Sequence, residues 1–327
     1  MKTEIFMITR RSKRNRTLTL SPGREQELRK QLTSISAPVS ADELTNRIFC
    51  DDLLKILEFL PDSFIDLLIL DPPYNLDKDF HGLHFRRRDP EGYLTYLESW
   101  FPKLMRCLKP DASVYLCGDW SCAVEHFRMM EKHLIIRNRI TWQREKGRGA
   151  LRNWKNASED ILFGTCSDQY YFDPDAVKMR RRVIAPYRAD GQPKDWEEKD
   201  GEKFRMTFPS NFWDDISVPY WSMPENTDHP TQKPEKLIAK LILASSPENG
   251  FVFDPFLGSG TTAVTAKKLG RRFCGIECNP EYCCWALERL VRAEKDARIQ
   301  GYEDGVFWER NSVKTGKKRA NVPSTAK

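Results

Sequence analysis

Residues 64–75 read FIDLLILDPPYN, an apolar run that stops at an acid, two prolines and a tyrosine. Its composition is typical of a buried strand, whereas proline lacks a backbone N–H and fixes φ, so the chain must leave the sheet after Leu70. The segment carries the Asp71 carboxylate, carbonyl oxygens without competing N–H donors, and the Tyr74 ring to the sheet edge. Two interpretations remain at this point: simple strand termination, or a site that accepts hydrogen bonds from a flat ligand.

Around this segment, strand-like runs alternate with stretches whose apolar residues recur at helical spacing. Such alternation predicts an α/β fold with a doubly wound, mostly parallel sheet covered by helices on both faces. The predicted strands are 47–50, 64–70, 113–118, 134–142, 160–165, 251–254 and 271–277. The predicted helices are 52–60, 93–109, 121–132, 233–246, 260–270 and 280–295.

Composition places the chain among ordinary globular proteins. It has 327 residues, which predicts one to two domains, and a net charge of +6, which permits contact with nucleic acid but is weak support for it. The nine cysteines show no Cys-x2-Cys spacing, so we expect reduced, mostly buried thiols and no metal site. No apolar run is long enough for a bilayer and the N-terminus lacks a secretory signal, so we expect a cytoplasmic protein without membrane contact.

Changes in texture along the chain predict five segments. Residues 1–45 form a basic, poorly ordered arm whose cluster at 10–16 either touches phosphates or is simply solvated. Residues 46–165 and 229–300 form the two halves of the α/β domain. Between them, residues 166–228 are polar, basic and aromatic with poor periodicity, which indicates either a recognition region or a long surface excursion. Residues 301–327 form a disordered basic tail.

A second motif, DPFLGSGTT at 254–262, joins a predicted strand to a helix. Gly258 and Gly260 permit positive φ, and the N–H groups of such a turn favour an anionic group. The motif lacks the P-loop ending and the Gly-x-Gly-x-x-Gly spacing, which argues against a nucleotide phosphate. The next strand ends in Glu277, which is 277 − 260 = 17 residues after the last loop glycine. An acid near this offset can bind ribose hydroxyls in doubly wound sheets.

With HPTQKP at 229–234 between them, DPPYN and DPFLGSGTT resemble the circularly permuted, β-group amino-methyltransferases of DNA, over roughly residues 46–295. The resemblance implies the seven-stranded methyltransferase sheet, with the catalytic motif before the cofactor motif. It implies S-adenosylmethionine as the cofactor and no metal. The implied cofactor-binding residues are Asp51, near the adenine, Thr231, Lys233, Asp254, Phe256, Gly258, Ser259, Gly260, Thr261 and Glu277, which takes the ribose hydroxyls.

The same resemblance assigns Asp71, Pro72, Pro73 and Tyr74 to catalysis. A base amine is a poor nucleophile because its lone pair is delocalised into the ring. We expect Asp71 and the Pro72 carbonyl to accept the amine hydrogens and to stabilise the positive charge that develops on the nitrogen. Tyr74 would stack on a base flipped out of double-stranded DNA.

Alternatives stay open within and outside this family. Aspartate at position 71 favours adenine N6 over cytosine N4, and residues 166–228 fall where the family carries its target-recognition region. An RNA or protein methyltransferase, or a non-catalytic DNA-binding derivative, fits the motifs less well. A separate restriction endonuclease is a possible partner, and the sequence leaves monomer and homodimer undecided.

Overall fold

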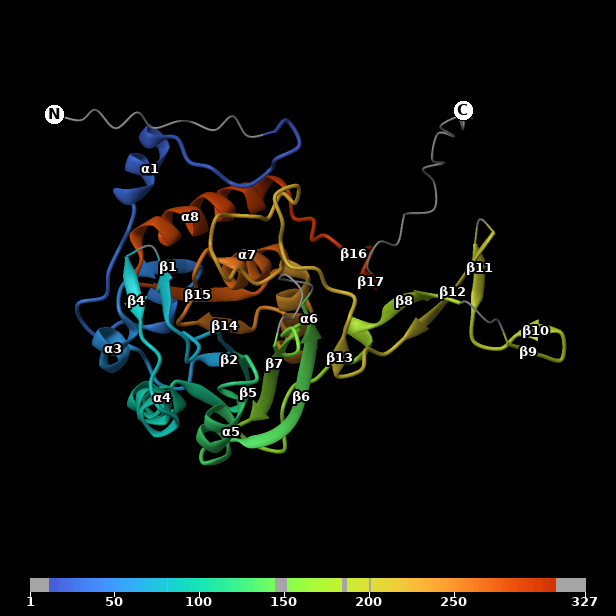
Figure 1. Cartoon of the computed structure of the whole chain (residues 1–327), viewed down its shortest axis with the longest axis horizontal. Coiled ribbons are helices and arrows are strands. Elements are labelled where there is room, and N and C mark those ends of the chain that lie inside the picture. The colour runs from blue at the N-terminus through green and yellow to red at the C-terminus, as the bar shows by residue number, and fades with distance from the viewer. Residues whose placement is uncertain (1–11, 81, 145–151, 184–186, 200, 310–327) are drawn as a thin grey trace.

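The structure is a computed structural model that describes residues 12–80, 82–144, 152–183, 187–199 and 201–309. Its centre is a sheet of eight strands in the order β1-β15-β14-β2-β5-β7-β6-β13 (Figure 1). The strands are β1 (Arg47–Cys50), β2 (Ile65–Leu70), β5 (Leu108–Gly118), β6 (Ile135–Gln143), β7 (Ser158–Thr165), β13 (Phe212–Trp213), β14 (Phe251–Asp254) and β15 (Arg272–Glu277). The pairs are parallel except those of β7, which runs antiparallel to β5 and β6. The predicted mostly parallel α/β sheet is confirmed.

Side chains alternate between the two faces of this sheet, as the twofold period of a strand requires. On β2, Leu68 and Leu70 enter one core and Leu67 and Ile69 enter the other. Helices cover the first face with α3 (Leu53–Ile56), the 3₁₀ turn η1 (Leu57–Phe59), α4 (Pro90–Met105) and α5 (Ala123–Glu131). The second face is covered by α6 (Glu235–Ser245), α7 (Thr261–Lys268) and α8 (Pro280–Lys295). Both faces of β2 are therefore buried away from solvent, which is why this strand is almost wholly apolar.

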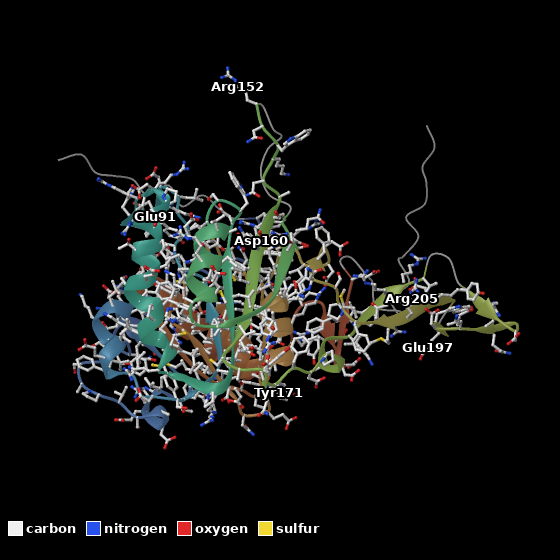
Figure 2. All side chains as sticks on the ribbon, turned by 90° about the horizontal axis from the view of Figure 1, so that it is seen from below. Glu91, Arg152, Asp160, Tyr171, Glu197 and Arg205 are labelled. Carbon is white, nitrogen blue, oxygen red and sulfur yellow. The ribbon has the colours of Figure 1, made fainter. Side chains whose placement is uncertain are left out.

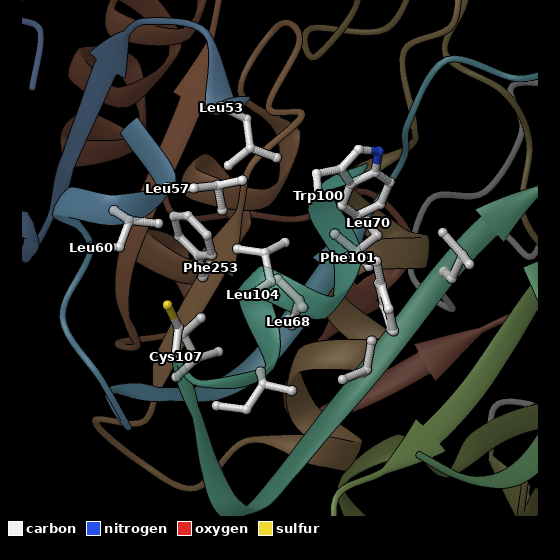
Figure 3. Close-up of a cluster of buried hydrophobic side chains, with 14 of the residues drawn as sticks. Leu53, Leu57, Leu60, Leu68, Leu70, Trp100, Phe101, Leu104, Cys107 and Phe253 are labelled. Atoms are coloured by element: carbon white, nitrogen blue, oxygen red, sulfur yellow. The ribbon is translucent and has the colours of Figure 1, made fainter. Parts of the chain in front are cut away.

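The first core shows how helix and strand periods meet. Trp100, Phe101 and Leu104 of α4 lie in one cluster with Leu68 and Leu70 of β2 and Phe253 of β14 (Figure 3). The helix predicted at 93–109 ends at Met105, because Leu108 and Lys109 already belong to the extended start of β5. A short hairpin of β3 (Lys78–Phe80) and β4 (Leu83–Phe85) follows the DPPYN segment. In the described part of the chain, no helix combines the length and apolar character needed to cross a membrane.

A smaller sheet projects sideways from the main body (Figures 1 and 2). Its strand order is β11-β12-β8-β17-β16, and a separate hairpin pairs β9 with β10. The elements are η2 (Asp175–Val177), β8 (Met179–Arg182), β9 (Arg188–Ala189), β10 (Gln192–Pro193), β11 (Glu197–Lys199), β12 (Glu202–Thr207), β16 (Tyr302–Glu303) and β17 (Val306–Trp308). Residues 166–228 thus contain short strands where the sequence showed poor periodicity.

Two expectations about the chain ends are wrong for the residues that the structure describes. Residues 12–45 are not a loose arm: they include α1 (Pro22–Arg29) and the four-residue α2 (Ala41–Leu44), whose N-terminus has a capping box. Residues 302–308 form β16 and β17 instead of a tail. In both places a few apolar residues suffice, because they are buried against distant partners. Residues 1–11 and 310–327, including Arg10 and Arg11 of the basic cluster, lie outside the described residues.

The N-terminal segment is fastened across the second face of the domain. The Arg16 amide donates to the Trp221 carbonyl at 2.6 Å, and the Leu18 amide donates to the Asn226 carbonyl at 2.8 Å. The Leu18 side chain is 2% exposed and lies against Tyr282 and Trp285 of α8. This strap therefore connects α8 with residues 221–226, just before the HPTQKP segment.

Replacing Leu18 by alanine tests this attachment. Truncating a buried leucine costs about 2–5 kcal/mol, and here the cost falls on the local strap. We expect hydrogen exchange at the Arg16 amide to accelerate by at least about tenfold, measured by mass spectrometry of the peptide around residue 16. Val291→Ala, on a 36% exposed position of α8, serves as the control. Unchanged exchange in Leu18→Ala would contradict the attachment.

Candidate active site

The two sequence motifs meet because their strands are neighbours. β14 pairs in parallel with β2, with Val252 opposite Leu67 and Phe253 opposite Leu68. Parallel strands end at the same edge of a sheet, so Asp71 and Asp254 emerge side by side. A cavity of about 440 Å³ opens at this edge. It is lined by Asp51, Asp71, Pro72, Pro73, Tyr74, Thr231, Lys233, Asp254, Phe256, Gly258, Ser259, Thr261 and Glu277, which are all the predicted site residues except Gly260.

The glycine loop has the geometry that requires glycine. Gly258 and Gly260 have φ values of +55° and +87°, in the left-handed region. A Cβ on Gly258 would lie 3.0 Å from His229 Nε2, and a Cβ on Gly260 would lie 2.5 Å from the Ala286 Cβ. Gly258 therefore lets the HPTQKP segment approach the loop. Gly260 lets α7 start against α8, so its place is in packing behind the cavity and not in its wall.

Glu277 ends β15 and anchors the same loop. Its Oε2 accepts a hydrogen bond from the Gly258 amide at 2.8 Å, and its Oε1 accepts one from the Asn279 amide at 2.7 Å. Burial raises the pKa of this carboxyl, while the two amide donors oppose that effect. The side chain is thus fixed at the cavity wall, next to the exposed thiol residue Cys278.

Asp51 and Asp254 are held by backbone donors as well. Asp51 Oδ2 accepts from the Ile35 amide at 2.9 Å, so this carboxylate ties residues 33–35 to the rim of the cavity. Its Oδ1 accepts from the Asp52 amide at 3.0 Å. Asp254 Oδ1 accepts from the Phe256 amide at 2.9 Å, and burial raises the pKa of this carboxyl to about 7. A large part of Asp254 is therefore protonated near neutral pH.

Asp71 carries the densest polar contacts of the cavity. Its two carboxylate oxygens lie 2.7 and 2.6 Å from Lys233 Nζ, and Oδ1 also accepts from the Tyr74 hydroxyl at 2.9 Å. Lys233 is 7% exposed and Asp71 is 20% exposed at the side chain, so solvent screens this ion pair only in part. Burial, with the neighbouring Asp71 charge, raises the pKa of Tyr74 well above its usual range. Tyr74 therefore stays a neutral donor.

Two residues of this cluster, Glu159 and Arg144, were not predicted from the sequence. Glu159, at the start of β7, is 2% exposed at the side chain and pairs through Oε1 with the Arg144 guanidinium. Its Oε2 lies 3.4 Å from both Lys233 Nζ and the Tyr74 hydroxyl. The available signal was an acid at the entrance of a buried apolar strand, SEDILF, where an unpaired charge would be costly.

The DPPYN loop is braced from behind. The Tyr93 hydroxyl donates to the Pro73 carbonyl at 3.0 Å and contacts His126 Nε2 at 3.1 Å. Burial lowers the pKa of His126 to about 4, so this ring is neutral and its hydrogen bond with the Tyr93 hydroxyl brings no charge behind the loop. Asn75 exchanges hydrogen bonds with the Arg88 backbone at 2.9 and 2.8 Å. The loop that presents Asp71 is therefore held on both sides.

Apolar side chains form a further part of the cavity lining. The Phe256 ring lies 5.0 Å from the Trp100 ring, centroid to centroid, in an edge-to-face arrangement. Tyr96, Leu53 and Leu54 also line the cavity. Thr231 lies at the wall, where its amide contacts His229 Nδ1 at 3.3 Å. The cavity thus combines a flat aromatic wall, a glycine loop with a carboxylate, and a second carboxylate paired with a lysine.

Comparisons with known proteins agree with this geometry. A family model described as DNA methylase matches residues 65–288. The type II methyltransferase M.HpaI of Haemophilus parainfluenzae is 32% identical over 267 residues, which cover 80% of this chain and 77% of the relative. The DNA adenine methyltransferase YhdJ of Escherichia coli K12 is 32% identical over 275 residues, which cover 80% of this chain and 90% of the relative.

Two solved structures share the fold. The cytosine-N4-specific PvuII DNA methyltransferase superimposes with a TM-score of 0.57 at 17% identity, covering 79% of this chain and 87% of that one. The structure of M1.HpyAVI in complex with S-adenosylmethionine superimposes with a TM-score of 0.52 at 22% identity, covering 75% of this chain and 98% of that one. The fold is therefore that of the S-adenosylmethionine-dependent methyltransferases. The chain belongs to the N6-adenine/N4-cytosine family of DNA methylases, which confirms the resemblance drawn from its motifs.

The raised pKa of Asp254 predicts a pH-dependent stability. Below the unfolded value near 4 the carboxyl is protonated in both states, and between about 4 and 7 only the folded state keeps the proton. Its stabilising contribution is therefore lost as pH rises through about 7. We expect the free energy of unfolding, from urea titrations, to fall more between pH 5 and 8 for the wild type than for Asp254→Asn. Burial also raises the pKa of Glu225 to about 7, but Glu225 is present in both proteins, so its contribution cancels in the comparison of the two pH profiles. Parallel pH profiles would show that Asp254 titrates normally.

Proposed function

We propose that this protein transfers a methyl group to the exocyclic amine of a base in double-stranded DNA, most directly adenine N6. The observation that carries the proposal is the position of the Asp71 carboxylate. It lies at the strand end next to the glycine loop, in one cavity with Glu277 and the aromatic wall. A second base, cytosine N4, is the alternative, because the family includes both amine targets.

The cavity fits S-adenosylmethionine as the methyl donor. Its volume of about 440 Å³ lies in the range of small-molecule sites. The loop at Gly258 and Ser259 lines the cavity, and Glu277, which the Gly258 amide holds in place, offers carboxylate oxygens as acceptors for ribose hydroxyls. Phe256 supplies a flat face for the purine. Asp51, whose oxygens already hold two amides, shapes the rim through residues 33–35.

When bound, the cofactor supplies a methyl group activated by a positively charged sulfur. The protein's part is to make the base amine nucleophilic and to exclude water. Asp71 and the Pro72 carbonyl accept the amine hydrogens and stabilise the charge that develops on nitrogen. The Tyr93 and Asn75 contacts keep this loop in place, so the acceptors need not reorganise during the reaction. Tyr74 stacks on the base that has been flipped out of the duplex.

The projecting sheet is the DNA-reading surface in this proposal. Cations lie over aromatic rings along it: Arg180 Cζ is 4.4 Å from the Phe204 centroid, and Arg188 Cζ is 5.2 Å from that of Trp196. Tyr187 is 65% exposed. Arginine and lysine suit phosphate and guanine contacts, and exposed aromatic rings suit stacking. In this proposal the protein acts in the cytoplasm, and a restriction endonuclease is its partner as a separate protein.

The first test is direct. Purified protein, unmethylated DNA and S-adenosylmethionine should yield a methylated base, which nucleoside mass spectrometry of the digested DNA identifies. N6-methyladenine supports the leading proposal, and N4-methylcytosine replaces the target while keeping the site. Methylation of RNA alone, or of no nucleic acid, refutes the proposal.

Asp71→Ala should abolish transfer, by at least about 10²–10³-fold in kcat, because the main acceptor for the developing charge is lost. Cofactor affinity, measured by calorimetry, should largely survive, because the glycine loop and Glu277 are untouched. Asp71→Asn keeps an oxygen acceptor but no charge, so its kcat should lie between that of the wild type and that of Asp71→Ala. Normal turnover by Asp71→Ala would sink the scheme.

The projection can be shortened without disturbing the core. Replacing residues 187–199 by a short glycine–serine turn removes β9, β10 and β11 but leaves the pairing of β8 with β12. We expect sequence preference to be lost in a methylation assay on mixed DNA, with cofactor affinity within about twofold of the wild type. Retained preference would refute this assignment of the DNA-reading surface.

A further inference from the structure

Lys233 occupies the position that the proposed mechanism reserves for the target amine. Its ammonium group lies 2.7 and 2.6 Å from the two oxygens of Asp71, which are the acceptors that a base amine would need. An ammonium that stayed there during transfer would compete for those oxygens. It would also repel the positive charge that develops on the base nitrogen.

A second carboxylate, that of Glu159, lies close to the ammonium group of Lys233. Glu159 Oε2 is 3.4 Å from Lys233 Nζ, against 2.6 Å for the nearer oxygen of Asp71, so a small movement exchanges the closer partner. Arg144 fixes the other oxygen of Glu159, which keeps Glu159 from following the lysine. Because Glu159 is 2% exposed, an incoming cation there is weakly screened.

The backbone of Lys233 is anchored, whereas its side chain ends between two carboxylates. The Thr261 hydroxyl donates to the Lys233 carbonyl at 3.0 Å, which joins this residue to the start of α7 and the glycine loop. The lysine side chain is a flexible four-carbon stem with a compact charge, so it can move between two acceptors without moving the main chain. The Tyr74 hydroxyl, 3.1 Å from Nζ, lies between the same two carboxylates.

We propose that Lys233 is a movable counter-ion: it holds the acceptor oxygens of Asp71 until a target base enters, and then transfers to Glu159. The proposal rests on the methyl-transfer function proposed above and deepens it. Glu159 is a positioning residue, which acts through Lys233 and does not touch the base. Before the base enters, Asp71 is paired with Lys233 and Glu159 is paired with Arg144. After the base enters, Asp71 binds the base amine and Glu159 binds both Arg144 and Lys233. Each carboxylate therefore has a partner in both states.

Glu159→Gln keeps the shape of the side chain and removes its charge. With no second carboxylate to receive it, Lys233 should stay on Asp71, and kcat should fall by at least about tenfold. The Kd for S-adenosylmethionine and the Kd for DNA should change by no more than about twofold. Glu125→Gln is the matched control, because Glu125 is also buried but lies on α5 outside the cavity. A Glu159→Gln enzyme with wild-type kcat overturns the proposal.

A double variant separates this role from a structural one. In Glu159→Gln/Lys233→Met the obstructing ammonium is gone, so kcat should rise above that of Glu159→Gln alone by at least about threefold. A merely structural loss at Glu159 would instead be deepened by the second substitution. A double variant slower than the single one overturns the proposal.

The wild-type protein gives an independent answer if the variants fold poorly. In a crystal structure with target duplex and a non-reactive cofactor analogue, Lys233 Nζ should hydrogen-bond to Glu159, and the base amine should contact Asp71. Lys233 still bound to Asp71 beside an inserted base overturns the inference while leaving the proposed function intact. A wild-type protein that methylates no base refutes the proposed function itself.

Discussion

The parallel pairing of β14 with β2 is the constraint on which the rest of the site depends. Asp71 and Asp254 are separated by 183 residues (254 − 71), yet this pairing brings their strand ends together at one edge of the sheet. The adjacent pairing of β15 with β14 adds Glu277, and the pairing of β1 with β15 adds Asp51. Each carboxylate reaches the cavity because its strand is parallel to its neighbour and ends at the same level.

This arrangement concentrates acidic groups, and the protein satisfies them in two different ways. Asp51, Asp254 and Glu277 accept hydrogen bonds from backbone amides, which are fixed by the fold. Asp71 and Glu159 are instead satisfied by the side chains of Lys233 and Arg144. Amide-bound carboxylates can shape a site but cannot change partners, whereas a carboxylate paired with a flexible side chain can. The exchangeable pair lies where the proposed chemistry takes place.

Local signals in the sequence were sufficient for the α/β sheet and the strand-end motifs, because strand and helix periods are properties of short segments. They failed where a segment owes its order to a distant partner. Leu18 is buried only because Tyr282 and Trp285 lie under it, and β17 forms only because β8 is available to pair with it. The Glu159–Arg144 pair was missed for the same reason: its connection with Lys233 exists only after β7 has been placed beside β5 and β6.

The projecting sheet packs against α6, the helix that begins two residues after Lys233. Asp215, which follows β13, is buried in ion pairs with Lys236 and Lys240 of α6, at 2.6 and 2.9 Å. Removing one member of such a buried pair is costly, because the remaining charge has no solvent. Met179 of β8 also lies in a core with Ala239 and Leu243 of the same helix. Since α6 begins at Glu235, two residues after Lys233, the core that holds β8 also fixes the helix that directly follows this lysine. The proposed DNA-reading surface is thus joined to the proposed counter-ion by buried contacts, while the glycine loop holds the other end of the segment through Thr261.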